Sequence, residues 1–379
     1  MMTRYFNTAG PVDSEIDYCL PPLTRVDLDE ILHLIRQRKY FVLHAPRQTG
    51  KTSLLLALQE HINREGRYHC VYVNVEVGQT AREDVPTVMH AILDQLALRA
   101  ETEVDDPYLR ELLNKYLHTK NGHSFLNQLL TLWSQHWMKQ GKPIVLFIDE
   151  IDSLIGDSLL AVLRQLRAGY DKRPKLFPQS IILCGVRDIR DYRIHASSEK
   201  VPVAGGSAFN VKVESLRLGD FTKGEMTELI QQHTDETGQP FSDDAINQIW
   251  SLSSGQPWLV NALGYEVTYR MKENRDHSTT ITADMINRAK ENLILRRDTH
   301  IDQLIHKLEE SRVQRVIEPL LTSEADPESL SHDDIQYVRD LGLIKGTGKK
   351  IAIANPIYQE VIPRELTYTT QLRINHETE

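Results

Sequence analysis

Short, continuous runs of apolar residues alternate with helical patterns over the first 217 residues. The runs are rich in β-branched and aromatic residues, and their hydrophobicity is unbroken, as a parallel sheet covered on both faces requires. The predicted strands lie at residues 40–45, 70–75, 143–149, 180–186 and 209–216. Amphipathic segments between them predict helices. Strands that alternate with helices predict a doubly wound α/β domain over residues 1–217.

The pattern changes to consecutive helices after Leu218. Several of these segments open with a serine or threonine that is followed two or three residues later by an acid, which is typical of a helix start. The predicted helices lie at residues 221–238, 242–255, 256–274 and 282–297. We therefore expect an all-helical lid domain over residues 218–297.

A third unit is predicted from residue 298 onwards. Two helices are expected at residues 300–321 and 331–342. Two apolar runs then follow, joined by Gly346-Thr347-Gly348-Lys349, which indicates a hairpin. Helix, helix and hairpin are the outline of a winged helix-turn-helix domain at residues 298–367, with a tail at 368–379.

The composition limits the classes of protein to which this chain can belong. The chain has 379 residues, a net charge of −9 and three cysteines without a C-x-x-C pair. Widely spaced cysteines argue against a disulfide framework or a zinc site and predict a cytoplasmic protein. No apolar run approaches the about 18 residues that a membrane span needs, and the N-terminus lacks a secretory pattern. The negative charge gives no general attraction to nucleic acid.

The string A-P-R-Q-T-G-K-T nearly matches the phosphate-binding loop G-x-x-x-x-G-K-[ST], between a predicted strand and a predicted helix. Such a loop points backbone amides and a helix N-terminus at phosphate oxygens. Lys51 would reach the β- and γ-phosphates of ATP, and Thr52 would lend its hydroxyl to Mg²⁺. Ala45 replaces the usual first glycine and should fit if its φ is negative. The predicted nucleotide-binding residues here are Ala45, Pro46, Arg47, Gln48, Thr49, Gly50, Lys51, Thr52 and Ser53.

An apolar strand that ends in two acids follows about a hundred residues later, as P-I-V-L-F-I-D-E-I-D. Asp149 is predicted at the carboxyl end of the strand, where α/β sheets bind ligands, and would hold Mg²⁺ together with Thr52. Glu150 is predicted to activate the attacking water. Asp152 is expected to cap the following helix.

Arg187 follows the strand at 180–186. A guanidinium at this point would neutralise charge on the γ-phosphate, so Arg187 is a second predicted catalytic residue. The alternative is a surface arginine paired with Asp188 or Asp191.

Together, the Asp149-Glu150 pair, Arg187, the helical lid and the winged helix resemble the signal-transduction ATPases with numerous domains, within the wider AAA-like group. The likeness covers about residues 4–366 and implies an AAA-like P-loop fold. It also implies that Pro257, in Gly255-Gln256-Pro257, packs near the adenine and that Arg25 lies on the adenine side. The long sensor repeats and the effector domain usual in this lineage do not occur in the sequence.

The leading hypothesis is therefore an ATP- and Mg²⁺-dependent switch that hydrolyses ATP slowly and acts through a separately encoded protein effector or sensor. ATP binding is compatible with oligomer formation. One alternative is a nucleic-acid-associated ATPase of the origin-loader or transposition-helper type. It is disfavoured because residues 300–379 carry nine Lys and Arg against fourteen Asp and Glu. Another is a nucleotide-binding interaction module without meaningful hydrolysis.

Overall fold

The computed structural model describes residues 4–116, 124–187, 214–322 and 330–365. Its contacts divide the chain into two units. The α/β unit comprises residues 22–45 and 51–218, and the helical unit comprises residues 1–21, 46–50 and 219–379. Each unit is described by itself below.

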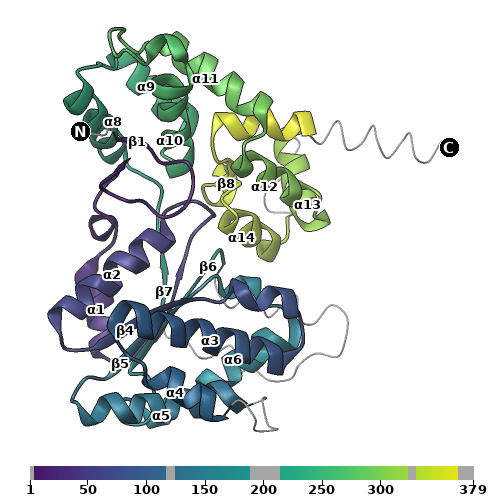
Figure 1. Cartoon of the computed structure of the whole chain (residues 1–379). Helices are drawn as coiled ribbons and strands as arrows, with labels where there is room; N and C mark the ends of the chain where they lie inside the picture. Colours follow the sequence, from purple (N-terminus) through teal and green to yellow (C-terminus); the bar gives the residue numbers. More distant parts are fainter. Residues whose placement is uncertain (1–3, 117–123, 188–213, 323–329, 366–379) are drawn as a thin grey trace. The chain divides into compact units, whose positions relative to one another are not determined.

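A parallel sheet of five strands forms the centre of the α/β unit, in the order β4-β5-β6-β3-β7 (Figure 1). The strands are β3 (Tyr40–His44), β4 (His69–Asn74), β5 (Ile144–Asp149), β6 (Ser180–Gly185) and β7 (Glu214–Arg217). β6 pairs with both β3 and β5, so it separates the strand before the predicted phosphate loop from the strand that ends in Asp149. Residues 209–213 of the last predicted strand lie outside the described residues.

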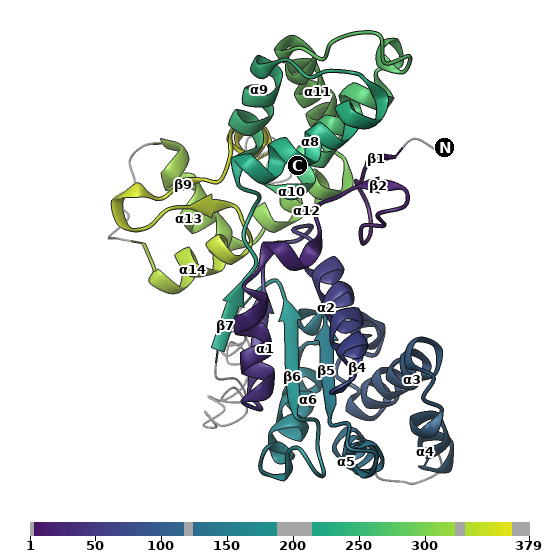
Figure 2. The ribbon, with the colours of Figure 1, turned by 90° about the vertical axis from the view of Figure 1, so that its left-hand side faces the viewer.

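Strand residues point alternately to the two faces of this sheet, as the two-residue period of a strand requires. In β5, Leu146 and Ile148 enter the core shared with α3, α5 and α6, whereas Val145 and Phe147 enter the core shared with α1 and α2. Both faces are therefore apolar, which explains the unbroken hydrophobicity of the strands. Figure 2 shows α1 and α2 along one face of the sheet.

Six helices occur in the described part of the α/β unit, and two of them begin at local sequence signals. Asp27 caps α1 by accepting from the backbone N of Glu30, and Asp84 caps α3, which has a proline in its first turn. The helices are α1 (Leu28–Arg36), α2 (Lys51–Glu65), α3 (Val85–Val104), α4 (Tyr108–Tyr116), α5 (Phe125–Lys139) and α6 (Gly156–Ala168).

The lid part of the helical unit begins with α8. A capping box starts this helix: the Thr222 side chain accepts from the backbone N of Glu225, and the Glu225 side chain accepts from the backbone N of Thr222. The predicted helix at 256–274 is interrupted, because α10 passes into a π-helical turn at Glu266–Arg270. The lid helices are α8 (Lys223–Thr237), α9 (Asp243–Ser253), α10 (Pro257–Tyr265) and α11 (Ala283–Arg296).

The first residues of the chain pack with the lid helices, although the prediction placed them in the α/β domain. Strands β1 (Tyr5–Phe6) and β2 (Asp17–Tyr18) form a short parallel pair. Phe6 is fully buried and lies so close to Gly264 that a Cβ there would approach the ring to 2.8 Å. Strands of two residues are too short to give a periodic pattern, so the sequence does not reveal them.

The C-terminal part shares one apolar core with the lid, so residues 219–365 are not divided at residue 298. The helix predicted at 300–321 is two helices, α12 (Thr299–Leu308) and α13 (Ser311–Thr322). The interruption falls at Glu310, whose carboxylate accepts hydrogen bonds from Lys307 and from Tyr337 of α14 (His332–Asp340). Strands β8 (Ile344–Lys345) and β9 (Ala352–Ile353) form the antiparallel hairpin, and residues 356–365 are helical. The tail predicted at 368–379 lies outside the described residues.

Candidate functional site

The predicted site residues of the α/β unit follow three neighbouring strands at the carboxyl edge of the sheet. Lys51 comes after β3, Asp149 ends β5, and Arg187 follows β6. Because β6 pairs with both other strands, the sheet brings their carboxyl ends together. Open α/β sheets bind ligands at this edge.

The loop between β3 and α2 contains two residues in the left-handed backbone region. Gln48 has φ 58° and Gly50 has φ 95°. Such values are costly for a residue with a side chain and are usually kept where the backbone conformation has a function. The Thr49 hydroxyl donates to the carbonyl oxygen of Pro46 at 2.8 Å and closes the turn. Ala45 does not have a positive φ, so the residue that departs from the glycine pattern fits without strain.

The first two side chains of α2 donate hydrogen bonds to two different groups. Lys51 is 6% exposed, and its Nζ donates to the carbonyl oxygen of Ala45 at 3.0 Å. The Thr52 hydroxyl donates to Oδ2 of Asp149 at 2.8 Å. The alternation of β5 accounts for this contact, since Asp149 points to the same face as Val145 and Phe147, which α2 covers.

Asp149 is fully buried, and three donors satisfy its carboxylate. Besides Thr52, the hydroxyl of Tyr72 donates to Oδ2 at 3.0 Å and the backbone N of Glu150 donates to Oδ1 at 2.9 Å. Burial of the ring and the nearby carboxylate raise the pKa of Tyr72, so its hydroxyl keeps the proton that it donates. Tyr72 did not stand out in the sequence, because only the pairing of β4 with β5 brings it to Asp149.

We expect Tyr72→Phe to lower the free energy of unfolding by about 1 kcal/mol, since it removes one hydrogen bond to a buried group. It should also weaken the apparent Mg²⁺ affinity in ATP hydrolysis by about 10-fold, because Tyr72 orients Asp149. Thermal unfolding and Mg²⁺ titrations of the ATPase rate measure the two effects. Tyr68→Phe makes the same chemical change in a half-buried tyrosine just before β4, far along the strand from Asp149, and should change neither quantity. Equal behaviour of the two variants would refute the assigned role of Tyr72.

The two acids after Asp149 differ in their surroundings. Glu150 has φ 55° and ψ 39°, a left-handed conformation that turns the chain sharply away from the strand. Asp152 accepts a hydrogen bond from the backbone N of Val186 at 3.1 Å and ties the end of β5 to the end of β6. The expectation that Asp152 caps the following helix is wrong, because α6 begins after Ile155 without a side-chain cap.

The remaining predicted residues of the α/β unit and the loop follow or flank the carboxyl ends of the strands. Arg187 is half-buried two residues beyond β6, and Arg47 is exposed in the loop. Ser53 lies in the first turn of α2. Arg25 ends a short 3₁₀ helix (Pro22–Arg25) that packs on α2. Across the described residues, no group of three or more His, Cys, Asp or Glu side chains forms a metal cluster, so a cation at this edge would depend on Asp149 and Thr52.

The comparison with protein families decides the class of the molecule. The AAA-like domain family matches residues 24–363, which include nearly all of both units. This chain belongs to the AAA-like domain family. It is therefore an ATP-binding ATPase of the Walker type, and the family implies that the nucleotide binds together with Mg²⁺. No curated protein matches the sequence.

Two solved structures show the same fold as the AAA-like chain. A Walker-type ATPase of Pyrococcus abyssi is 14% identical, with a TM-score of 0.57, and the match covers 94% of this chain and 99% of that chain. The ORC2 protein of Aeropyrum pernix is also 14% identical, with a TM-score of 0.52, and the match covers 93% of this chain and 97% of that chain. The α/β P-loop fold with a five-stranded parallel sheet, a helical lid and a C-terminal helical region is thus confirmed.

The Gly255-Gln256-Pro257 triplet belongs to the lid of the AAA-like chain and connects two of its helices. α9 ends at Ser253, and Gly255 follows with φ 82°. Pro257 occupies the first position of α10, and the Gln256 side chain accepts from the backbone N of Leu259 at 2.6 Å. The triplet therefore has a structural role as helix punctuation. Its relation to adenine stays a prediction.

We expect Gly255→Ala to destabilise the protein by about 2 kcal/mol or more, because a Cβ would meet the carbonyl oxygen of Phe221 at 2.1 Å in a left-handed backbone. Gly238→Ala is the matched control, since Gly238 has φ 76° but no atom within 4 Å of the added Cβ. It should cost only about 1 kcal/mol. Chemical denaturation of both variants measures the difference. Equal losses of unfolding free energy in the two variants would show that the contact with the Phe221 carbonyl oxygen does not add to the cost.

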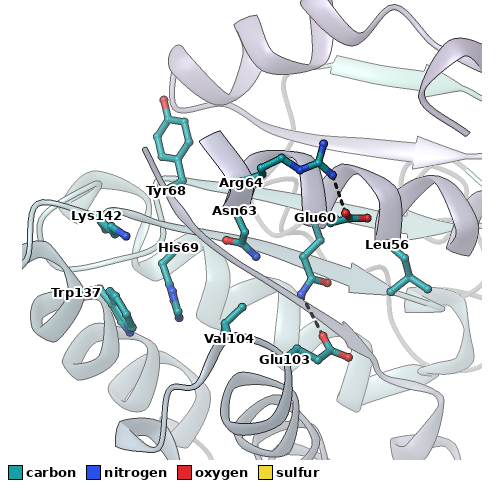
Figure 3. Close-up of a pocket in the computed structure, with 11 residues that line it drawn as sticks. Leu56, Glu60, Asn63, Arg64, Tyr68, His69, Glu103, Val104, Trp137 and Lys142 are labelled. Carbon is teal, nitrogen blue, oxygen red and sulfur yellow. Dashed lines mark hydrogen bonds and ion pairs between the residues drawn. The ribbon is translucent and has the colours of Figure 1, made fainter. Parts of the chain in front are cut away.

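A separate hollow of about 590 Å³ lies beside the amino ends of β4 and β5, at the opposite edge of the sheet (Figure 3). Its wall includes His69 and Trp137, whose rings stack with centroids 3.6 Å apart. Trp137 also donates to the buried carboxylate of Asp106 at 2.6 Å. None of the predicted nucleotide-site residues lines this hollow.

Among the described residues, no helix has both the length and the apolar character needed to cross a membrane.

Proposed function

We propose that this AAA-like protein is an ATP-dependent conformational switch that hydrolyses ATP slowly and passes its state to a separately encoded protein. The proposal includes membership of the signal-transduction ATPases with numerous domains, which the Asp149-Glu150 pair, the lid and the C-terminal hairpin motivate. Slow turnover suits a switch, because the bound nucleotide must persist long enough for a partner to respond.

The side chains at the carboxyl edge of the sheet have distinct roles in this proposal. Lys51 and the amides of the loop bind the phosphates, and Thr52 and Asp149 hold Mg²⁺, which neutralises phosphate charge when bound. Glu150 orients the attacking water and accepts its proton. Pro257 and Arg25 contact the adenine side, as the resemblance implies.

The contact between Thr52 and Asp149 is the observation that carries the nucleotide site. The hydroxyl comes from the start of α2 and the carboxylate from the end of β5, 97 residues later, and they meet at 2.8 Å. A hydroxyl and a carboxylate at the carboxyl edge of a parallel sheet are the pair with which P-loop enzymes hold Mg²⁺. This donor set fits the ion, because hard oxygen ligands are those that Mg²⁺ prefers.

A close contact within the helical unit supports coupling to the C-terminal hairpin. Gly342, in the turn after α14, has φ 80°, and a Cβ there would lie 2.7 Å from Cγ of Pro46 in the loop. Lys345 of the hairpin donates to the hydroxyl of Ser254 at 2.9 Å, next to Gly255. The same hairpin region thus contacts the loop and the lid. A change in the loop on nucleotide exchange would be transmitted to both.

Small-angle scattering of the full chain tests the switch. We expect different scattering curves with ADP and with ATP when Glu150→Gln preserves the triphosphate. Lys51→Ala should give one curve in both nucleotides at concentrations that saturate Glu150→Gln, since it binds them much more weakly. Identical curves for Glu150→Gln in saturating ADP and ATP would exclude a switch, while leaving nucleotide binding itself intact.

Arg187→Ala is expected to leave ATP affinity nearly unchanged and to lower the hydrolysis rate by about 10-fold or more. The reason is that a guanidinium at the end of β6 would stabilise charge that develops only during phosphate transfer. Single-turnover rates and binding calorimetry separate the two effects. Arg67→Ala removes an exposed arginine just before β4, outside the predicted site, and serves as the comparison. Unchanged single-turnover rates in Arg187→Ala would reduce this residue to a surface arginine.

The nucleic-acid alternative gains no support from the hairpin. The Lys345 ammonium donates a hydrogen bond to the hydroxyl of Ser254, and the side chain of Lys349 lies outside the described residues. In α14, Asp334 is bound by Arg312 and Arg315. A salt-dependent gel shift that disappears in Lys349→Glu/Lys350→Glu would favour this alternative.

A further inference from the structure

Three tyrosines, two of them exposed and one half-buried, form a continuous group on the helical unit. The rings of Tyr265 and Tyr269 stack with centroids 5.0 Å apart, and the edge of Tyr5 meets Tyr265 at 6.2 Å. Tyr269 is 50% exposed and Tyr5 is 42% exposed. Exposed aromatic groups of this kind are enriched at protein interfaces, where they provide most of the binding energy.

Two arginines lie against these rings. The Arg270 guanidinium lies 5.6 Å from the centre of the Tyr265 ring, and the Arg275 guanidinium lies 4.7 Å from that of Tyr269. Lys272 is exposed and lies between these two arginines in the sequence. We call the set the tyrosine patch. It consists of Tyr5, Tyr265, Tyr269, Arg270, Lys272 and Arg275.

The acids near the tyrosine patch are largely neutralised. Glu266 is 3% exposed, and Arg296 binds its carboxylate at 2.9 Å, while Arg270 lies 3.8 Å away. Glu273 pairs with Arg288 at 2.9 Å. Asp276 is another acid close in sequence, and its carboxylate accepts hydrogen bonds from the backbone N and the hydroxyl of Ser278. The patch therefore presents positive charge on a chain whose net charge is −9.

The backbone under the patch is held in an unusual form. Tyr265 directly precedes the π-helical turn Glu266–Arg270, which contains Tyr269. The Glu266 carboxylate anchors this turn from inside, because Asn292 of α11 donates to it at 2.9 Å. Isolated π-helical turns are rare and are frequent at functional sites. A fixed backbone also lowers the entropy cost of binding a partner.

We propose that the tyrosine patch binds an acidic peptide segment of the partner protein, in which carboxylates alternate with apolar side chains. Carboxylates would bind the guanidinium groups and Lys272, while apolar side chains would pack against the edges of the tyrosine rings. Single-stranded nucleic acid fits less well, because bases need open ring faces for stacking, and the faces here already contact one another and the two arginines. The proposal depends on the proposed function only for the existence of a partner.

Fluorescence anisotropy of labelled peptides on the full chain tests this proposal. The probes are a short Glu- and Phe-containing peptide, a second peptide with Ser in place of Phe, a third with Lys in place of Glu, and oligo-dT of similar length. We expect saturable binding of the first in the micromolar range, at least about 10-fold weaker binding of the second, and none of the third. Binding should weaken as salt is raised. Absent binding of the first peptide, or preferential binding of oligo-dT, would overturn the proposal.

Two variants locate the binding surface. Lys272→Glu/Arg275→Glu and Tyr269→Ser should each weaken binding of the first peptide by about 10-fold or more. Arg64→Glu/Lys142→Glu carries the same change of net charge in the α/β unit and should bind like the wild type. Equal affinity in all of them would overturn the proposal. ATP binding, measured in parallel, should be unchanged in every variant, so a failure of the tyrosine patch is distinguishable from a failure of the nucleotide site.

Discussion

Replacing Lys51 with alanine is expected to weaken ATP binding by about 100-fold or more. Lys51 is buried at the start of α2, and its ammonium is held 3.0 Å from the carbonyl oxygen of Ala45. A positive charge in this position would face the phosphates from within a loop of backbone amides. Its removal takes away the strongest single attraction for the triphosphate, and water cannot replace it in a buried position.

Isothermal titration calorimetry with ATP and Mg²⁺ measures this effect. Because Lys51 is buried, the thermal unfolding midpoint of the variant must be measured beside its affinity. Lys51→Arg keeps the charge but enlarges the side chain, so it separates loss of charge from loss of fit. Lys39→Ala, which removes a lysine just before β3, is the control and should bind like the wild type. Unchanged affinity in a folded Lys51→Ala protein would refute the phosphate-loop assignment.

The second large effect is expected for Glu150→Gln, which should lower ATP turnover by about 100-fold and leave ATP affinity nearly unchanged. The amide can keep a hydrogen bond to water but cannot accept its proton. Thr52 binds the carboxylate of Asp149 and not that of Glu150, so the change should not remove this contact.

Phosphate release and calorimetry on the same preparation distinguish this expectation from the interaction-module alternative. Glu76→Gln is a matched control, because Glu76 is exposed and follows β4 near the same edge of the sheet. If Glu150→Gln and the wild type hydrolyse ATP at the same rate, the activity comes from a contaminant or from another residue. In that case the protein is better described as a nucleotide-binding module.

Much of the α/β unit could be predicted because its strands are buried on both faces. The unbroken apolar runs at 40–45, 70–75 and 143–149 correspond to strands at Tyr40–His44, His69–Asn74 and Ile144–Asp149. The proximity of Thr52 to Asp149 followed from the phosphate-loop string and the apolar strand that ends in acids.

Other features depend on contacts between distant segments, and sequence patterns do not reveal those. Tyr72 reaches Asp149 only through strand pairing, and Asp152 binds the backbone of Val186 instead of capping a helix. The N-terminal segment has no periodicity, yet Arg4 forms an ion pair with Glu236 of the lid at 2.8 Å. Glu310, at the break between α12 and α13, likewise contacts Tyr337 of another helix.

The most direct test of the account is calorimetry of the pure, folded full chain with ATP in the presence of Mg²⁺. We predict saturable heat with a stoichiometry near one, which disappears in Lys51→Ala and weakens when Mg²⁺ is chelated. The absence of any binding heat from ATP for the wild-type protein would contradict the nucleotide site and, with it, the proposed switch.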